Sequence, residues 1–363
     1  MTYEGEEPIE VNGKKVVAFK ESGEWTVPDG VTEVDVLVVA GGGSGGWASS
    51  RCGGGGAGEL VFSHNYDVLS GKSIDITVGE GGIADGDADP RFGNNGEDSI
   101  FDDLVAKGGG SGGRYEDPGS DENGADGGSG GGARGSSSTS GSGGSSTASL
   151  GYGNRGGNNV GSGVAREGGG GGGAGEPGMD ASNSGTTGHG GDGLYEVEID
   201  GTTYNFASIF GTEYGEVIDN EAWFAGGGGS TNNSGNSYPG GKGGGGDGNS
   251  SDGLSNTGGG AGGNQYTGGS GVVLIAYEEL PFTIKGIVNL NASPVEGAIV
   301  RLFNQDENTY ITHDVTNASG EYSFEALEEG VEYHVTVEYL DEATDDKYYS
   351  KSAPFIQPWE DEE

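Results

Sequence analysis

The sequence predicts a mainly β protein with almost no α-helix, in which a frame of β-strands encloses a bundle of glycine segments and a smaller antiparallel β-sandwich follows. Three observations predict this fold. Short stretches of alternating apolar and polar residues occur both before and after a long glycine-rich region. Of the 84 glycines, 80 lie upstream of residue 281. Beyond that residue, strand-like runs recur at a spacing of roughly 8 to 12 residues, which is typical of a sandwich.

The β-frame begins with residues 14–39, which predict three short strands separated by the turn sequences SGE and PDG. Further strand-like stretches are found at 58–68, 73–79, 99–108 and 270–278. The last of these has the same Val, Ile and Leu content as the others although it lies far downstream. The frame is therefore expected to open before the glycine region and to close after it.

The glycine region consists of many short blocks separated by polar, turn-like sequences such as 115–126. One interpretation is a flexible coil, since glycine loses the most backbone entropy on ordering. The other is a bundle of polyglycine II helices, each with about three residues per turn, whose backbone groups hydrogen-bond to neighbouring helices. A linker would form one long tract, so the alternation of blocks and turns favours the bundle. The blocks include 108–113, 127–135, 167–175, 225–230, 240–248 and 257–263.

An insertion at residues 193–227 interrupts the glycine region and is rich in apolar residues. Its first half predicts a β-hairpin that turns at Asp200-Gly201, a dipeptide suited to positive φ. The aromatic residues around it allow two interpretations, an apolar cap over the end of the bundle or an exposed recognition surface. The candidate receptor-binding residues are Tyr204, Phe206, Tyr214, Trp223 and Tyr238.

The charge of the chain restricts its partners and its surroundings. Fifty-eight acidic residues against 16 basic ones give a net charge of −42, and the acidic residues are spread along the chain. This composition suits a protein that must stay hydrated at high salt, so we expect a halophilic, haloarchaeal source. Nucleic acid is not an expected partner, because binding phosphates requires clustered Lys and Arg. No stretch approaches the roughly 18 apolar residues of a membrane span, and the N-terminus shows no export signal.

Residues that could support catalysis are few, and no enzymatic activity is expected. The four histidines share no metal-ligand spacing, Cys52 is the single cysteine, and the many G-x-G-x-x-G matches follow from glycine abundance alone. Asp85, Asp87 and Asp89 have the alternate spacing of a calcium loop but lack its glycine and glutamate. They are a candidate site for Ca²⁺ or another cation, with a solvated acidic turn as the favoured alternative; no other cofactor is expected.

Four asparagines begin N-x-S sequences that could accept glycans in an exported protein. Such sequences arise by chance in a chain rich in Asn, Ser and Gly, so glycosylation is not assumed. They are Asn232, Asn249, Asn291 and Asn317.

Several landmarks over residues 14–278 occur in a fixed order. They are FKESGEWTVPDGVTEVDVLVVAGGGSGG, GGGGAGEL, ITVGEGG, blocks of consecutive glycines, and AGGNQYTGGSGVVLIAY. This order resembles the glycine-rich domain of phage tail fibres and related virion proteins. The resemblance implies a β-frame around a polyglycine II sandwich whose end loops contact the host surface. The acidic character and the 193–227 insertion depart from that pattern, so no receptor-binding residue is carried over.

Residues 281–357 resemble the carboxypeptidase-regulatory-like, prealbumin-type modules, in IKGIVNLNASPVEGAIVRLF and HDVTNASGEYSFEALEEGVEYHVTVEY. This resemblance implies an Ig-like antiparallel β-sandwich that acts as a spacer or contacts carbohydrate. We therefore expect four parts: an N-terminal attachment segment at 1–13, the glycine-rich domain at 14–278, the sandwich at 281–357, and an acidic tail at 358–363.

The expected function is non-catalytic, multivalent attachment to a host envelope by a virion surface protein of a halophilic tailed virus. A tail fibre, a baseplate or a capsid appendage would suit this role, and such a protein would assemble in the host cytoplasm. Expected partners are other virion proteins, including further copies of this chain, and a host surface protein or glycan. The alternatives are a purely structural virion spacer or decoration protein and a cellular envelope adhesin, which is expected to carry a secretion signal.

Overall fold

A computed structural model describes residues 7–28, 30–47, 51–84, 93–114, 122–136, 140–159, 167–181, 188–232, 234, 236–278, 282–305, 309–327, 333–341 and 346–351. The chain divides into two compact units, residues 1–278 and 279–363. The described part is mainly β-structure in antiparallel sheets, with one helix of five residues. The predicted fold class is confirmed at this level.

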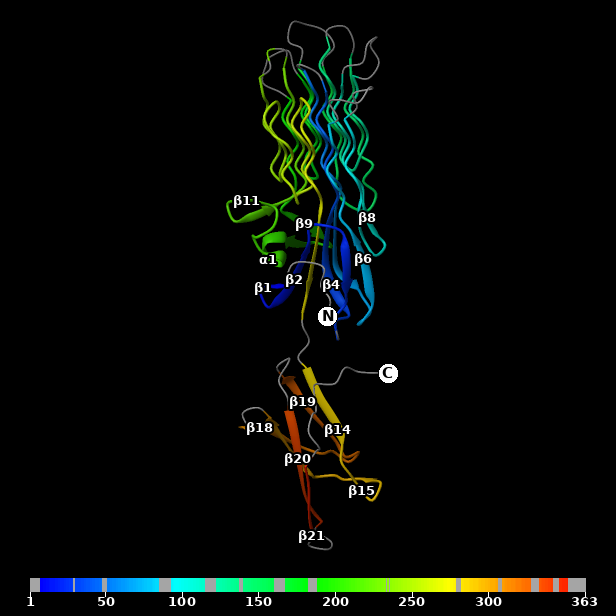
Figure 1. Ribbon diagram of the computed structural model, residues 1–363, viewed down its shortest axis with the longest axis vertical. Helices are drawn as coiled ribbons and strands as arrows, with labels where there is room; N and C mark the ends of the chain where they lie inside the picture. The colour runs from blue at the N-terminus through cyan, green and yellow to red at the C-terminus, as the bar shows by residue number, and fades with distance from the viewer. Residues whose placement is uncertain are drawn as a thin grey trace. The chain divides into compact units, whose positions relative to one another are not determined.

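The first unit is organised around a five-stranded antiparallel sheet in the order β1-β2-β13-β4-β5, of which Figure 1 labels β1, β2 and β4. Its first long strand pairs with its last, and Val17 lies opposite Ile275. The glycine region therefore leaves this sheet and returns to it, as the sequence predicted. The strands are β1 (Ile9–Val11), β2 (Lys14–Phe19), β4 (Glu33–Val39), β5 (Leu60–Asp67) and β13 (Val272–Tyr277).

A second antiparallel sheet has the order β3-β6-β7-β8. Its strands are β3 (Gly23–Thr26), β6 (Ser73–Thr77), β7 (Ser99–Phe101) and β8 (Leu104–Ala106). The sequence suggested one strand at 99–108, whereas the structure forms two. Asp102 has a φ of 51° and makes the turn between them, because Asp tolerates the left-handed region better than most residues.

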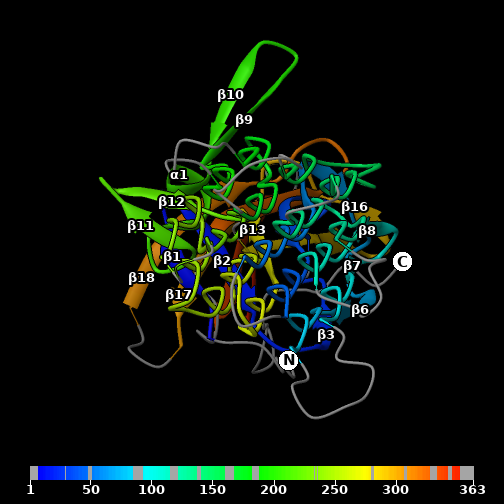
Figure 2. The ribbon, with the colours of Figure 1, turned by 90° about the horizontal axis from the view of Figure 1, so that it is seen from above.

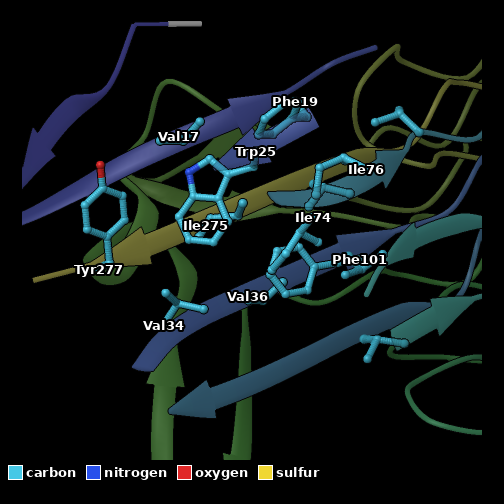
Figure 3. Close-up of a cluster of buried hydrophobic side chains, with 14 of the residues drawn as sticks. Val17, Phe19, Trp25, Val34, Val36, Ile74, Ile76, Phe101, Ile275 and Tyr277 are labelled. Carbon is cyan, nitrogen blue, oxygen red and sulfur yellow. The ribbon is translucent and has the colours of Figure 1, made fainter. Parts of the chain in front are cut away.

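Side chains from both sheets form one hydrophobic core (Figure 3). The buried Trp25 ring lies at its centre, with its centroid 5.9 Å from that of Tyr277 and 6.1 Å from that of Phe101. Alternate residues Val36 and Val38 of β4 point into the same core. This packing confirms the frame of strands predicted from apolar alternation.

Beyond the sheets, the glycine segments run side by side without strand pairing, and Figure 2 shows them end-on. Segment 53–58 hydrogen-bonds through its backbone to segments on every side of it. The backbone N–H groups of residues 54 to 59 donate to carbonyl oxygens of three other segments at 2.8 to 3.2 Å. The donor–acceptor pairs are Gly54 to Gly169, Gly55 to Ala261, Gly56 to Gly110, Ala57 to Gly172, Gly58 to Gly258 and Glu59 to Lys107. Two donors that are three residues apart therefore bind the same neighbouring segment. This is the period that a polyglycine II helix requires, although the helical form of each segment stays a prediction.

The close approach of these segments explains the glycine content. A Cβ atom built on Gly55 would overlap the carbonyl oxygen of Gly43, and one on Gly171 would overlap that of Gly55. The bundle also extends further than the sequence suggested. Gly124 and Ala125, assigned above to a turn, donate to Ser142 and Ser111 at 2.9 Å and are part of the bundle.

The insertion covers the outer face of the five-stranded sheet. Phe206, Phe210 and Phe224 are buried there against side chains such as Leu37 and Leu274. It contains β9 (Glu196–Ile199), β10 (Thr202–Asn205), α1 (Phe206–Phe210), β11 (Glu216–Ile218) and β12 (Glu221–Trp223). The predicted hairpin is confirmed, with φ of 50° at Asp200 and 79° at Gly201. The Asn205 side chain accepts a hydrogen bond from the Ser208 N–H and begins the helix.

The described residues of the second unit form two larger antiparallel sheets and a short hairpin. Ile284 and Phe324 from one sheet and Val300, Leu302 and Val335 from the other share one core. One sheet pairs β14 (Phe282–Ile287) with β19 (Glu321–Leu327), and the hairpin pairs β15 (Asn289–Leu290) with β16 (Ser293–Pro294). The other sheet has the order β18 (Thr309–Val315), β17 (Ile299–Asn304), β20 (Tyr333–Asp341) and β21 (Asp346–Lys351). An Ig-like or prealbumin-type assignment of this unit stays a prediction.

The ends of the chain were predicted as separate segments. Residues 9–11, within the expected N-terminal attachment segment, form β1 and pair with β2. The predicted acidic tail at 358–363 lies outside the described residues. Among the described residues, no helix has the length and apolar character needed to cross a membrane.

Candidate functional site

The predicted receptor-binding aromatics lie mostly in the interior. Phe206 is fully buried, and Tyr214, Tyr238 and Trp223 are 5%, 7% and 9% exposed. Rings with so little exposed area offer little contact surface to a large partner while the domain stays folded. The structure therefore uses these rings for packing, and the exposed aromatic recognition surface suggested by the sequence does not form among them.

Four of these aromatics belong to the insertion, and Phe206, Tyr214 and Tyr204 pack on the outer sheet face. The half-buried Tyr204 ring lies 5.5 Å from Phe62 and 4.5 Å from His64, measured between centroids. His64 in turn contacts the buried Asp35, with 2.6 Å between Nδ1 and Oδ1. The hairpin is thus fixed to the sheet by an aromatic contact beside the hydrogen bond between His64 and the buried Asp35.

Tyr238 lies apart from the insertion, within the glycine bundle. Its hydroxyl donates to Glu167 Oε1 at 3.0 Å, and its ring centroid lies 5.9 Å from that of His189. Burial raises the pKa of the Tyr238 hydroxyl, and the hydrogen bond to Glu167 adds to this effect. Tyr238 therefore links the segment that contains it to the segment that begins at Glu167.

A groove beside Trp223 is the most distinctive surface feature of the insertion, and we call it the insertion groove. It has a volume of about 360 Å³ and lies between the β9-β10 hairpin, which projects outward in Figure 2, and two loops of the glycine region. Its lining residues with functional groups include Glu176, Asp192, Tyr195, Glu196, Glu198 and Trp223.

The two aromatic rings of the insertion groove are held in fixed positions. The Tyr195 and Trp223 centroids are 4.6 Å apart at an interplanar angle of 44°, and Trp223 Nε1 donates to Glu221 Oε2 at 3.2 Å. The Lys242 ammonium lies 4.5 Å from the Trp223 ring centroid, a cation–π contact. A hydrogen bond to Glu196 raises the pKa of the Tyr195 hydroxyl above its ordinary value. This site could bind a ligand that offers both an apolar face and hydrogen-bond donors. Sequence reasoning identified Trp223 but missed Tyr195, whose neighbour Trp223 is 28 residues away along the chain.

The end of the glycine bundle distant from the sheets brings together large side chains from separate segments. There Gly46, next to Trp47, donates to Gly53 at 3.0 Å, and Gly135 donates to the carbonyl of Arg51 at 2.8 Å. Arg134, also at this end, has its Nη1 3.9 Å from Glu122 Oε1. Trp47, Arg51 and Arg134 thus belong to segments that meet at this end of a strongly acidic protein.

The candidate cation site at Asp85, Asp87 and Asp89 lies outside the described residues. Among the described residues, no group of three or more His, Cys, Asp or Glu is placed to hold a metal ion. Of the N-x-S asparagines, Asn249, Asn291 and Asn317 are exposed and Asn232 is half-buried.

A family model described as a glycine-rich domain matches residues 18–278, which include the four-stranded sheet, strands β4, β5 and β13 of the five-stranded sheet, the glycine bundle and the insertion. No curated protein matches the chain.

Proposed function

The chain belongs to the glycine-rich domain family, and from that premise we propose that it is a virion surface protein that attaches a halophilic tailed virus to its host envelope. It would belong to a tail fibre, a baseplate or a capsid appendage, assemble in the host cytoplasm, and act by binding without catalysis. The partner would be a host surface protein or glycan.

The observation that carries this proposal is the construction of the glycine bundle. The segments reach a common far end, and both ends of the region return to paired strands β2 and β13. Each internal segment is held by backbone hydrogen bonds on several sides, so the bundle resists bending. A stiff support with one fixed end and one free end suits the presentation of residues to a surface.

The charge of −42 supports action in concentrated salt. The Debye length is only about 3 Å at 1 M salt, so contacts with a host would depend on short-range packing and hydrogen bonds. Weak contacts of this kind become effective when several copies act together. We therefore propose that several copies of the chain are present on each virion, with the second unit, as an Ig-like module, acting as a spacer or a carbohydrate-contacting part.

The test is binding of the purified full-length protein to haloarchaeal cells in high-salt medium, together with its ability to block virus adsorption. We expect saturable binding and blocking. Arg114 follows Gly113, whose N–H donates to Gly132 at 2.8 Å near the far end of the bundle, and Arg114→Glu should weaken both. Arg155→Glu, on a half-exposed arginine paired with Asp180 at 2.9 Å, is the matched control and should leave both unchanged.

Absence of binding by a folded sample would contradict attachment and favour a structural spacer or decoration protein. Saturable binding without interference with any virus would instead favour a cellular envelope adhesin.

A further inference from the structure

We propose that the insertion groove binds one saccharide ring of a neutral glycan. The Tyr195 ring contacts the C–H face of the sugar, and the carboxylates of Glu176, Glu196 and Glu198 accept hydrogen bonds from its hydroxyls. The inference rests on the proposed function, because the glycan would belong to the host envelope.

The aromatic side of the insertion groove is rigid before any ligand arrives. Tyr195 is half-exposed, and its ring centroid lies 4.6 Å from that of Trp223. Trp223 is itself held by Glu221 and is only 9% exposed, so it supports Tyr195 from behind. A ring fixed in this way loses little conformational entropy on binding, which favours affinity for a small ligand.

The polar side of the groove consists mainly of hydrogen-bond acceptors. Glu198 and Thr203 are register partners on the exposed hairpin, while Glu176 and Asp192 come from the loops. The Asp192 side chain already accepts the Lys242 N–H at 2.9 Å, which leaves the three glutamates as the main acceptors for a ligand. Among the described residues, no three carboxylates lie close enough together to hold a metal ion. The groove carboxylates are therefore suited to accept hydrogen bonds from different hydroxyl groups of one ligand. Sugar hydroxyls supply such donors, and hydrogen bonds to carboxylates are stronger than those to neutral acceptors.

The groove is lined by four carboxylates, so a cation is the alternative ligand that must be tested. The Trp223 ring, the best aromatic partner for a cation, already carries the Lys242 ammonium at 4.5 Å. A neutral saccharide would use the Tyr195 ring and the glutamates without competing with Lys242. The volume of about 360 Å³ lies at the lower end of small-ligand sites and suits a single ring.

The test uses saturation-transfer NMR on the full-length protein at high salt. The probes are the methyl glycosides of glucose, galactose, mannose and N-acetylglucosamine, with tetramethylammonium as a cationic probe. We expect transfer to the C–H protons of at least one glycoside, and affinity lowered roughly tenfold or more by Tyr195→Ala. Glu198→Gln, on an exposed hairpin position, should lower affinity severalfold while leaving the fold intact. Tyr152→Ala removes a partly exposed tyrosine outside the groove and should have no effect.

The inference is overturned if the folded protein binds none of the glycosides, or if Tyr195→Ala and Glu198→Gln bind as the wild type does. Binding of tetramethylammonium alone, lost as salt is raised, would also overturn it in favour of a cation site. Saturable cell binding that Tyr195→Ala leaves unchanged would keep the proposed function and reject the groove. Glycoside binding without cell binding would keep the groove as a saccharide site and reject the proposed function.

Discussion

The β-frame and the glycine bundle of the first unit are stabilised in opposite ways. In the frame, large side chains such as Trp25 and Phe101 are buried between two sheets. In the bundle, the chain has almost no side chains to bury, and N–H and C=O groups of neighbouring segments satisfy one another. The frame removes apolar surface from water, whereas the bundle avoids the cost of burying unpaired backbone groups. One unit therefore contains two kinds of interior, which differ in the substitutions they tolerate.

The largest effect is expected from adding a side chain within the bundle. Gly171→Val places a Cβ against the carbonyl of Gly55, in a region where backbone surrounds it and no flexible side chain can move away. Overpacking of this kind costs about 3 kcal/mol or more, so we expect the bundle to unfold or aggregate. Circular dichroism and thermal unfolding measure the loss.

The matched control for this substitution is Gly201→Asn at the hairpin tip. A Cβ at Gly201 meets nothing within 4 Å, and Asn tolerates its φ of 79°. Equal loss of stability in both variants would contradict the backbone-packed bundle.

The next largest effect is expected from removing a large side chain from the frame. Trp25→Ala leaves a cavity between the two sheets and should lower the free energy of unfolding by about 3 to 5 kcal/mol. Chemical denaturation measures it. Trp25→Phe keeps most of the volume and should cost much less, since cores tolerate changes that conserve volume better than truncations. A loss from Trp25→Phe as large as that from Trp25→Ala would argue against this packing account.

An intermediate effect is expected at Glu59, where a side chain does enter the bundle. The carboxylate is fully buried and accepts N–H groups from Lys107, Ser149, Leu150 and Gly151 at 2.7 to 3.0 Å. Glu59→Gln turns one acceptor oxygen into a donor that faces other donors, so we expect a loss of about 2 kcal/mol. Denaturant unfolding measures this loss, and Glu33→Gln, at an exposed position, serves as the control. If both variants match the wild type, these contacts do not stabilise the bundle.

The smallest effect is expected from alkaline titration of the frame. Burial raises the pKa of the Tyr66 hydroxyl, with further contributions from its hydrogen bonds to Asp103 and Asp102 and from their charges. The folded state keeps its proton longer than the unfolded state, whose tyrosine titrates at the ordinary value of 10.0. This contribution to stability is therefore complete below pH 10 and is lost as the pH rises above it. Between about pH 9 and about pH 11, the free energy of unfolding should fall less steeply for Tyr66→Phe than for the wild type. Equal slopes for the two proteins would contradict this contribution of Tyr66.

The strand positions were predictable because apolar alternation is a local signal. The strands at 14–39, the return strand at 270–278 and the hairpin turn at Asp200-Gly201 all agree with the structure. The break at Asp102 and the bundle position of Gly124 were missed. A turn and an ordered polar segment have similar composition, and only neighbours farther along the chain, such as Ser142, which accepts the Gly124 N–H, distinguish them.

The candidate site was predicted only in part for the same reason. Trp223 stood out as a rare, large residue in a glycine-rich chain. Its role depends on Tyr195 and Lys242, which no spacing rule connects with it. Whether an aromatic residue of the insertion is buried or exposed depends on which face of the five-stranded sheet the insertion covers. The sequence did not indicate that face.

The sequence by itself determined that this protein has two kinds of interior, because alternating apolar residues can bury side chains and pure glycine blocks can bury only backbone. Only the tertiary structure decided which glycine segments become neighbours, where the insertion packs, and which of its side chains line a groove. Those arrangements depend on contacts between residues far apart in the chain, and such contacts leave no local pattern.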